Sequence, residues 1–440
     1  MKTTTKNEVK HAEIGDSPKP AVDDKKRRST LGDYFALQRG ATYKSSLLGQ
    51  PGPVLLGLAT IRRNGGFRTD SLRTYGGESP DKLLVQPGEI YVSLKDVTQS
   101  ADLLGAVARL PHGHLAGRLT QDTVKLEPKD DDVPLDYLYW LLRTPQYRAY
   151  CRAHSTGTTN LGLSREDFLG FPAPEPTSKQ LLLVETLGTL DAKIELNQQM
   201  SRTLELTAKA VFKHWFVDFD FPNEQGKPYK SSGGEVVYNK EFGNDIPKEW
   251  HAKSIDEVAS FLNGLALQRY PLQGDEEGLP AIKIRELRQG VIESTDRASS
   301  NIPEEYVVDD GDVLFSWSGS LEAVLWTSGK GALNQHLFKV TSAEFPKWFY
   351  YQWIHHYLPE YRRTAEGKAT TMGHIQRHHL SDSIVLVPDD ATVKRMDRVL
   401  GPILERQIQL GIESRNLSHI LDMLLPKLMT GRIRVPFGAA

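Results

Sequence analysis

The stretch "DAKIELNQQMSRTLELTAKAVFKHWF" (residues 191–216) lies near the middle of a 440-residue chain and carries a heptad pattern. Small or apolar residues recur at intervals of three and four, and Asn197 fills the one polar step; they are Leu187, Leu190, Ile194, Ser201, Leu204, Ala208, Val211 and Trp215. This spacing predicts a helix with a coiled-coil seam. The breaker "PAPEPTS" precedes the pattern, so we expect a helix over residues 177–217 with Ser178 as its N-cap.

A second and stricter seam lies near the C-terminus, in a helix predicted over residues 389–432. Its residues are Met396, Leu400, Ile403, Gln407, Leu410, Ser414, Leu417, Leu421, Leu424 and Leu428. Polar seam residues lower the stability of a coiled coil but fix its register. Helices of this length span roughly 40 Å, which is more than a compact domain covers. We expect the helices to pair with each other or with partner subunits; packing of each on its own domain is the alternative.

The sequence on either side of the first seam repeats itself. "FALQRG" (35–40) is matched by "LALQRY" (265–270), and "QPGEIYVS" (86–93) by "DDGDVLFS" (309–316). In the same order, "LTQDTVKL" is matched by "LNQHLFKV", and "TGTTNLGLSREDF" by "KATTMGHIQRHHL". Four ordered matches with a shrinking offset favour a duplication.

Each copy runs from strand-rich segments to an aromatic helix, a Gly/Thr loop, a short strand and a long helix. The aromatic helices are predicted over 136–153 and 347–363. We therefore predict an α+β fold with two similar strand-rich domains, separated by two long helices that form an antiparallel coiled coil with pseudo-twofold symmetry. The predicted segments are 1–30 (disordered tail), 31–176 (first domain), 177–217 (central helix), 218–245 (linker), 246–388 (second domain), 389–432 (C-terminal helix) and 433–440 (tail).

Composition describes an ordinary globular chain, with 39% hydrophobic and 25% charged residues and a net charge of −2. The single cysteine, Cys151, excludes an internal disulfide, suits a reducing compartment and is interpreted as a buried small hydrophobe. No apolar run approaches the roughly 18 residues of a membrane span, and the N-terminus lacks a signal-peptide core. We expect a cytoplasmic protein without a membrane partner.

Catalytic motifs are missing from the sequence. No G-x-x-x-x-G-K-[ST] phosphate loop and no G-x-G-x-x-G after a strand are present. The histidine pairs lack the cysteines or the H-E-x-x-H spacing of a metal site. We therefore expect no catalytic residue, no metal and no cofactor in this chain.

Basic, Gly-rich segments are the candidates for a nucleic-acid interface, because Arg and Lys bind phosphates and read guanine edges. The first copy contains "ATIRRNGGFRTDSLRTYGG" (59–77), and the corresponding part of the second contains "AIKIRELRQG" (281–290). A solvated charged loop is the alternative for each residue. The candidate DNA-binding residues, including the threonines of the Gly/Thr loops, are Arg39, Lys44, Arg62, Arg63, Arg68, Arg73, Thr158, Thr159, Arg269, Lys283, Arg285, Arg288, Thr370 and Thr371.

Taken together, these features resemble the specificity subunits of type I restriction-modification enzymes. The similarity covers about residues 31–432 and rests on "TGTTNLGLS", "KIELNQQMSRTLELTAKAVFKHWFVDF", "EFGNDIPKEW", "GDVLFSWSGS" and "ALNQHLFKV". The loop "GKATTMGH" of the second copy departs from the usual Gly-Thr pattern. A coiled-coil scaffold or adaptor without sequence-specific DNA binding is the competing hypothesis.

The resemblance implies that each strand-rich domain is a target recognition domain for one half of a bipartite site in double-stranded DNA. The helices would set the gap and dock two methyltransferase subunits, which bind S-adenosylmethionine; motor-nuclease restriction subunits would use ATP and Mg²⁺. The apolar residues expected at the coiled-coil or partner interface are Leu190, Ile194, Leu204, Val211, Phe212, Trp215, Phe216, Leu410, Leu417, Leu421, Leu424 and Leu428.

Overall fold

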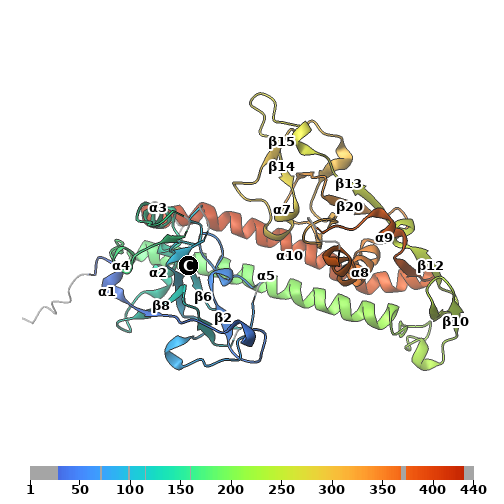
Figure 1. The fold of residues 1–440 in the computed structure, drawn as a ribbon, viewed down its shortest axis with the longest axis horizontal. Helices are drawn as coiled ribbons and strands as arrows, with labels where there is room; N and C mark the ends of the chain where they lie inside the picture. Colours follow the sequence, from blue (N-terminus) through green and yellow to red (C-terminus); the bar gives the residue numbers. More distant parts are fainter. Residues whose placement is uncertain are drawn as a thin grey trace, which may run out of the picture. The chain divides into compact units, whose positions relative to one another are not determined.

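The computed structural model describes residues 28–69, 72–97, 100–113, 115–158, 160–367 and 373–430. The chain divides into two compact units, and each is described by itself below. The first unit comprises Met1–Val184 with Leu428–Ala440, and the second comprises Glu185–Lys427. Figure 1 labels many of the helices and strands.

The first unit contains two small sheets. The larger has the order β1-β8-β4-β6 and is antiparallel; its strands are Phe35–Arg39, Thr123–Pro128, Ile90–Ser93 and Val107–Arg109. The smaller has the order β2-β7-β3, with β2 parallel to β7; its strands are Val54–Leu56, Gly117–Leu119 and Leu84–Val85. A short ladder joins β5 (Lys95–Asp96) to β9 (Leu161–Gly162). Tyr91, Leu119 and Leu56 fill the core between the sheets.

The second unit repeats this arrangement. Its larger sheet has the order β13-β20-β17-β18, made of Ser260–Asn263, Leu337–Thr341, Val313–Ser316 and Ala323–Leu325. Its smaller sheet has the order β15-β14-β19-β16, made of Arg297–Ala298, Leu279–Ile282, Gly331–Leu333 and Val307–Val308. Two further pairs are β10 (Val236–Asn239) with β11 (Asn244–Pro247) and β12 (His251–Ser254) with β21 (Ile384–Val387).

Strand order and register confirm the duplication but correct one sequence match. In the smaller sheets β2–β7 and β14–β19 are both parallel. The "ALQR" of the second copy forms η5 (Leu267–Arg269), whereas the strand equivalent to β1 is β13. A glycine that follows this strand in each copy supports the equivalence of β1 and β13, because backbone packs closely against it. A Cβ atom at Gly40 would lie 2.0 Å from the Thr120 carbonyl oxygen, and one at Gly264 would lie 2.3 Å from the Asn334 carbonyl oxygen. Both copies therefore need glycine there.

Short helices frame the sheets in each copy. Before the first strand stand α1 (Leu31–Tyr34) and α6 (Ile255–Val258), both with capping boxes. Before the long helices stand α4 (Arg165–Leu169) and α9 (Arg377–Ser381), and α7 (Ile284–Gln289) occurs in the second copy. The remaining 3₁₀ turns are Ser45–Leu47, Leu58–Thr60, Asp81–Leu83, Lys230–Ser232 and Glu304–Tyr306.

The aromatic helix of the first copy is broken, contrary to the prediction of one helix over 136–153. It forms α2 (Leu135–Leu141) and α3 (Pro145–Ala153), because Pro145 has no amide hydrogen to donate and Thr144 caps a new helix. The Thr144 hydroxyl donates to the Leu141 carbonyl (2.7 Å). The second copy retains one helix, α8 (Lys347–Gly367).

The two long helices are α5 (Ser178–Phe216) and α10 (Asp390–Thr430). Thr177, not Ser178, caps α5: its amide donates to the Gln180 side-chain oxygen (2.9 Å), and the Gln180 amide donates to the Thr177 hydroxyl (3.4 Å). This is the reciprocal pattern of a capping box. Among the described residues, no helix is both long and apolar enough to cross a lipid bilayer.

The core of the second unit joins α5, α8 and α10 to the larger sheet. Met396, Leu400 and Leu404 of α10 belong to this core with Trp353 and Phe349 of α8. The Trp348 indole nitrogen donates to Asp397 (2.8 Å), which links α8 to α10. Farther along α10, Arg415 donates from one nitrogen to both carboxylate oxygens of Asp310 (2.7 and 2.9 Å) and to the Thr327 carbonyl (3.0 Å). These contacts fix the position of α10 against the second unit.

His355 of α8 makes this unit sensitive to acid. Its Nε2 atom is buried without a hydrogen-bond partner among the described residues. Burial first, and then the nearby positive charge of Lys209 on α5, lowers the pKa of His355 from 6.5 to about 4. The neutral ring is therefore favoured in the folded state. Its contribution to stability is present above pH 6.5 and is lost as pH falls toward 4, because the unfolded chain binds a proton that the folded chain does not.

We expect His355→Leu to weaken the pH dependence of unfolding by up to one proton, or about 1.4 kcal/mol per pH unit, between pH 6.5 and 4. Urea unfolding followed by tryptophan fluorescence reports this, because six of the seven tryptophans lie in the second unit. His419→Leu, at an exposed position of α10, is the control and should keep the wild-type pH dependence. Equal pH dependence of His355→Leu and wild type would contradict the assignment.

Candidate nucleic-acid interface and helix surfaces

The Arg/Gly segment of the first unit forms a tight, docked turn. Gly65 and Gly66 have φ of 109° and 107°, a region that favours glycine. The Gly66 amide donates to the Val107 carbonyl (2.8 Å), and the Asn64 amide donates to the Asp102 carbonyl (2.9 Å). The turn is held against the loop that leads into β6.

The predicted arginines of this segment differ in their surroundings. Arg63 pairs with Asp102 (3.3 Å), and its side chain is about half exposed. Arg62 is half-buried and Arg68 is exposed, and both interact with other groups. Arg73 is exposed, and its backbone carbonyl accepts a hydrogen bond from the Leu55 amide (2.8 Å).

In the second unit, each predicted cation of the basic segment is bound to a carboxylate. Lys283 pairs with Asp296 (2.6 Å), and Arg285 pairs with Glu286 (2.8 Å), which is fully buried. Arg288 pairs with Glu322. Arg285 therefore pairs with a buried carboxylate, a structural role that its sequence context does not indicate. All three offer less net positive charge to phosphates than their number suggests.

The two basic segments occupy equivalent places in their units. Asp102, the partner of Arg63, lies in the loop before β6, and Glu322, the partner of Arg288, lies in the loop before β18. Strands β6 and β18 have the same place at the end of the larger sheets. The sequence match between these segments is thus supported by their ion pairs.

Four predicted cations, Arg39, Lys44, Arg73 and Arg269, are exposed and form no ion pair with any described residue. Arg39 ends β1, and Lys44 precedes the 3₁₀ turn Ser45–Leu47; the Lys44 amide donates to the Tyr75 hydroxyl (3.3 Å). Tyr43, beside Lys44, was not predicted as a site residue from the sequence. Tyr43 is 40% exposed and packs edge-on against Tyr75 at 6.2 Å. It adds an aromatic surface to a basic one.

The threonines of the Gly/Thr loops are only partly described. Thr158 is exposed in the turn that joins Thr156 to Gly162. Thr159, Thr370 and Thr371 lie outside the described residues.

The part of the chain that the structure describes contains no cluster of metal-ligating side chains. Within these residues, no group of three or more His, Cys, Asp and Glu side chains is placed to hold a metal ion. Cys151 is fully buried, as expected, and burial raises the pKa of its thiol.

The seam residues of α5 and α10 lie on the buried faces of these helices. The Asn197 amide nitrogen donates to Glu413 (2.9 Å), and Lys193 pairs with the same carboxylate (3.4 Å). Asn197 is fully buried and its side-chain oxygen has no partner among the described residues. The remaining predicted interface residues are buried (Ile194, Leu410, Leu421) or half-buried (Leu190, Leu204, Val211, Leu417, Leu424), and the side chain of Leu428 is not described.

The aromatic end of α5 is buried between helices of its own chain. Phe212 contacts Trp353 of α8 with ring centroids 5.0 Å apart, and Phe216 contacts Trp250 at 5.1 Å. Phe212, Trp215 and Phe216 are 4%, 8% and 1% exposed. They are core residues of the second unit, so of the two expected roles for this end, burial within the chain holds. The seam here meets α8 as well as α10.

A different face of α5 is apolar and exposed. Its residues follow at three- and four-residue intervals and contain no charge; we name Thr189, Ala192, Leu196, Met200, Thr203, Thr207 and Ala210 the outer stripe. Each threonine hydroxyl donates to a backbone carbonyl four residues earlier, at 2.8–3.0 Å, which leaves its methyl group outward. Leu206, beside the stripe, is 62% exposed.

These features define a duplicated α+β protein, with two strand-rich copies of one topology and two long antiparallel helices. Each strand-rich copy carries one basic segment. No protein-family model matches the chain. It is 27% identical over 321 residues to the type I restriction enzyme MjaIX specificity subunit of Methanocaldococcus jannaschii, covering 70% of this chain and 71% of that protein. It is 28% identical over 196 residues to the type I restriction enzyme EcoBI specificity subunit of Escherichia coli, covering 43% of this chain and 40% of that protein.

A solved structure has the same fold. The S subunit of a type I restriction-modification system from M. genitalium aligns with a TM-score of 0.52 at 13% identity, covering 92% of this chain and 97% of that chain. The chain is a homologue of type I restriction enzyme specificity subunits.

Proposed function

We propose that this chain gives a type I restriction-modification complex its DNA sequence specificity, each strand-rich copy reading one half of a bipartite site in double-stranded DNA. The observation that carries the proposal is the duplication of one two-sheet topology, with basic segments at equivalent places of both copies. A scaffold with no role on DNA would need the helices but not the duplicated units. We retain the domain boundaries predicted above as part of this proposal, with one correction: the first domain includes residues 28–30, because Arg28 pairs with Asp130 (2.7 Å) and Thr30 caps α1.

The DNA-binding surface would combine exposed and paired cations. Arg39, Lys44, Arg73 and Arg269 are free of ion pairs with described residues, so they suit phosphate contacts. Arg63 and Arg288 would have to exchange a carboxylate for DNA, which lowers their net contribution.

The chemistry would belong to other subunits, in the cytoplasm. Two methyltransferase subunits would bring S-adenosylmethionine and flip out the target adenine. Restriction subunits would use ATP and Mg²⁺. We assign catalysis to these partner subunits because the sequence of this chain lacks the catalytic motifs searched for above.

Deletion of the gene in its host tests this function. We expect one bipartite methylation motif to disappear from the genome, as measured by sequencing of methylated bases, and to return with the intact gene. An unchanged methylome in a strain that expresses the intact complex would refute the proposed function.

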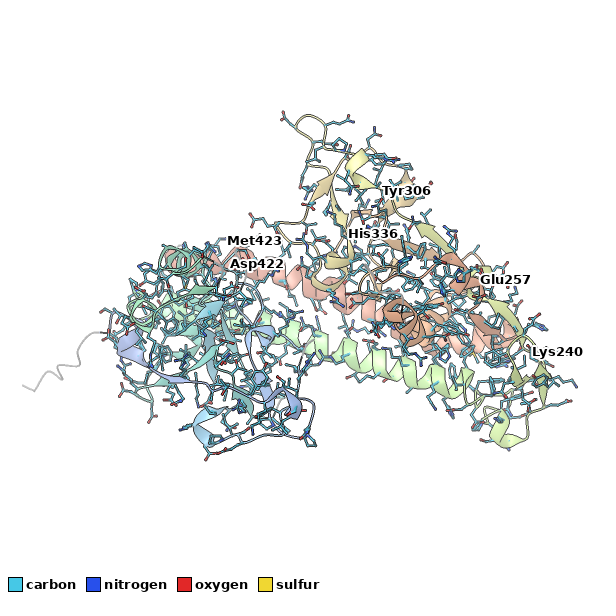
Figure 2. All side chains as sticks on the ribbon, in the orientation of Figure 1. Lys240, Glu257, Tyr306, His336, Asp422 and Met423 are labelled. Atoms are coloured by element: carbon cyan, nitrogen blue, oxygen red, sulfur yellow. The ribbon has the colours of Figure 1, made fainter. Side chains whose placement is uncertain are left out.

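We further propose that the outer stripe of α5 docks a methyltransferase subunit. Neutral, regularly spaced and exposed, it fits an apolar helix face of a partner. On α10, Ile420 and Met423 are 40% and 51% exposed and offer a place for the second subunit (Figure 2 labels Met423).

Leu196→Glu with Leu206→Glu should reduce co-purification of the methyltransferase at least tenfold, because two charges would enter an apolar contact. Val217→Glu, at an equally apolar and 41% exposed position beyond the stripe, is the matched control. Trp215→Ala should instead destabilise the second unit by about 3–5 kcal/mol. Full recovery of the complex with the double variant would place docking elsewhere.

The helices would also set the number of unread base pairs between the half-sites. Seven residues of helix rise about 10.5 Å, which corresponds to about three base pairs of DNA. One heptad inserted after Asp191 and one after Ser418 keeps the Asn197–Glu413 and Arg415–Asp310 contacts and leaves both seams in phase.

Methylome sequencing of cells carrying this double insertion should show both half-sites with a gap about three base pairs longer. Insertion of five residues at each point, which turns the seam out of phase, should abolish methylation. An unchanged gap in an active heptad variant would mean that these helices do not determine the spacing.

A further inference from the structure

The duplication allows positions of the two units to be compared through strand register alone. Ser93 of β4 pairs with Thr123 of β8, and Ser316 of β17 pairs with Leu337 of β20. Counting from these pairs gives equivalent residues without any sequence alignment. Both serines are fully buried, so they serve as equivalent reference points for the strand register of the two copies.

One ion pair is retained in both copies. Lys125 pairs with Glu89 (2.8 Å), and its equivalent Lys339 pairs with Asp312 (3.0 Å). Each lysine also donates to the carbonyl of the strand that follows a 3₁₀ turn: Lys125 to Leu84 (3.3 Å) and Lys339 to Val307 (2.9 Å). Because this ion pair and the carbonyl acceptor of its lysine are equivalent in both copies, we infer that the pair stabilises the fold.

At the other end of the same strands the chemistry has changed. Lys95, two residues after Ser93, donates to Asp122, one residue before Thr123 (3.1 Å). In the second unit the same places hold Ser318 and His336, whose hydroxyl and Nδ1 atoms are 3.1 Å apart.

The neighbouring position at the end of the first strand has changed as well. Arg39 of β1 lies opposite Val124, and its equivalent Asn263 lies opposite Phe338. The Asn263 side-chain oxygen accepts a hydrogen bond from the Trp317 indole (2.9 Å). Gly40 and Gly264 follow in both copies, so the backbone is unchanged while the side chain differs.

We propose that these strand-end positions read DNA bases: Arg39, Lys95 and Asp122 in the first unit, and Asn263, Ser318 and His336 in the second. The inference rests on the proposed function and deepens it. Phosphates are the same at every base pair, so residues that bind them can be alike in both copies. Residues that read different half-sites must differ in their hydrogen-bonding groups on a shared frame.

The chemistry of the first unit defines the base pair that it reads. Lys and Arg donate to guanine O6 and N7, and Asp accepts from cytosine N4, so Lys95 with Asp122 matches a G·C pair in the major groove. Their side chains are 51% and 29% exposed, which leaves them accessible. The second unit has no permanently charged group at these three places, and His336 (labelled in Figure 2) is held between Ser318 and Gln335. Its half-site is therefore read by hydrogen-bonding groups that carry no permanent charge.

The Gly/Thr loop of the first unit lies beside this cluster. Lys95 pairs across the β5–β9 ladder with Gly162, and Gly162 bridges to Thr156. In the second unit Ser318 bridges to His374 at the same place. This places exposed Thr158 near the strand end, where a phosphate contact would accompany base reading.

The test exchanges the pair between units in the complete complex. Lys95→Ser with Asp122→His should change or relax one base pair of one half-site, by roughly tenfold in preference. The other half-site and the gap should stay the same in the methylome. Ser318→Lys with His336→Asp should alter one position of the opposite half-site. An exposed ion pair contributes little to stability, so the first exchange is not expected to unfold the unit.

The retained ion pair supplies the matched control. Lys125→Met with Glu89→Gln should lower the thermal unfolding temperature and leave the methylated motif intact. If an exchange variant loses all methylation, the conservative Asp122→Asn decides the matter, and it should relax the same base pair. An unchanged motif in Asp122→Asn and in the exchange variants overturns the inference. Loss of the motif on gene deletion would still support the proposed function, so the two failures are distinguishable.

Discussion

Burial of the aromatic end of α5 in the second unit is the interaction on which the rest of the structure depends. Phe212 and Phe216 lie among the rings of Trp353 and Trp250, in a core that also takes in Met396 and other residues of α10. One apolar cluster thus anchors the end of the central helix and the start of the C-terminal helix. The large area of aromatic surface removed from water makes this anchor strong.

Polar contacts then determine how α10 is placed in this unit. Apolar packing is not directional, so a seam of leucines permits small slips along the helix. The Asn197–Glu413 hydrogen bond and the hydrogen bonds from Arg415 to Asp310 are directional and are lost if the helix slips. A protein whose helix length sets a distance on DNA would need such fixed register.

Much of the candidate interface could be predicted from the sequence as a set of residue types but not as an arrangement of charges. Arg285 was recognised as basic, yet its partner is the adjacent, fully buried Glu286. Exposed Arg39 was recognised from a repeat match that the register of β13 corrects. The strand-end pairs Lys95–Asp122 and Ser318–His336 were missed, because their members are distant in sequence and meet through β pairing.

The sequence by itself determined the two long helices, their apolar faces and the duplication, because heptad spacing and repeats are local properties of the chain. Tertiary structure alone decided what those faces meet. From the sequence, the aromatic end of α5 could be either a partner surface or a contact between helices. In the folded chain it packs against α8. Folding also paired several cations with carboxylates and left the outer stripe exposed. Burial and ion pairing depend on residues far apart in the chain, so no local pattern specifies them.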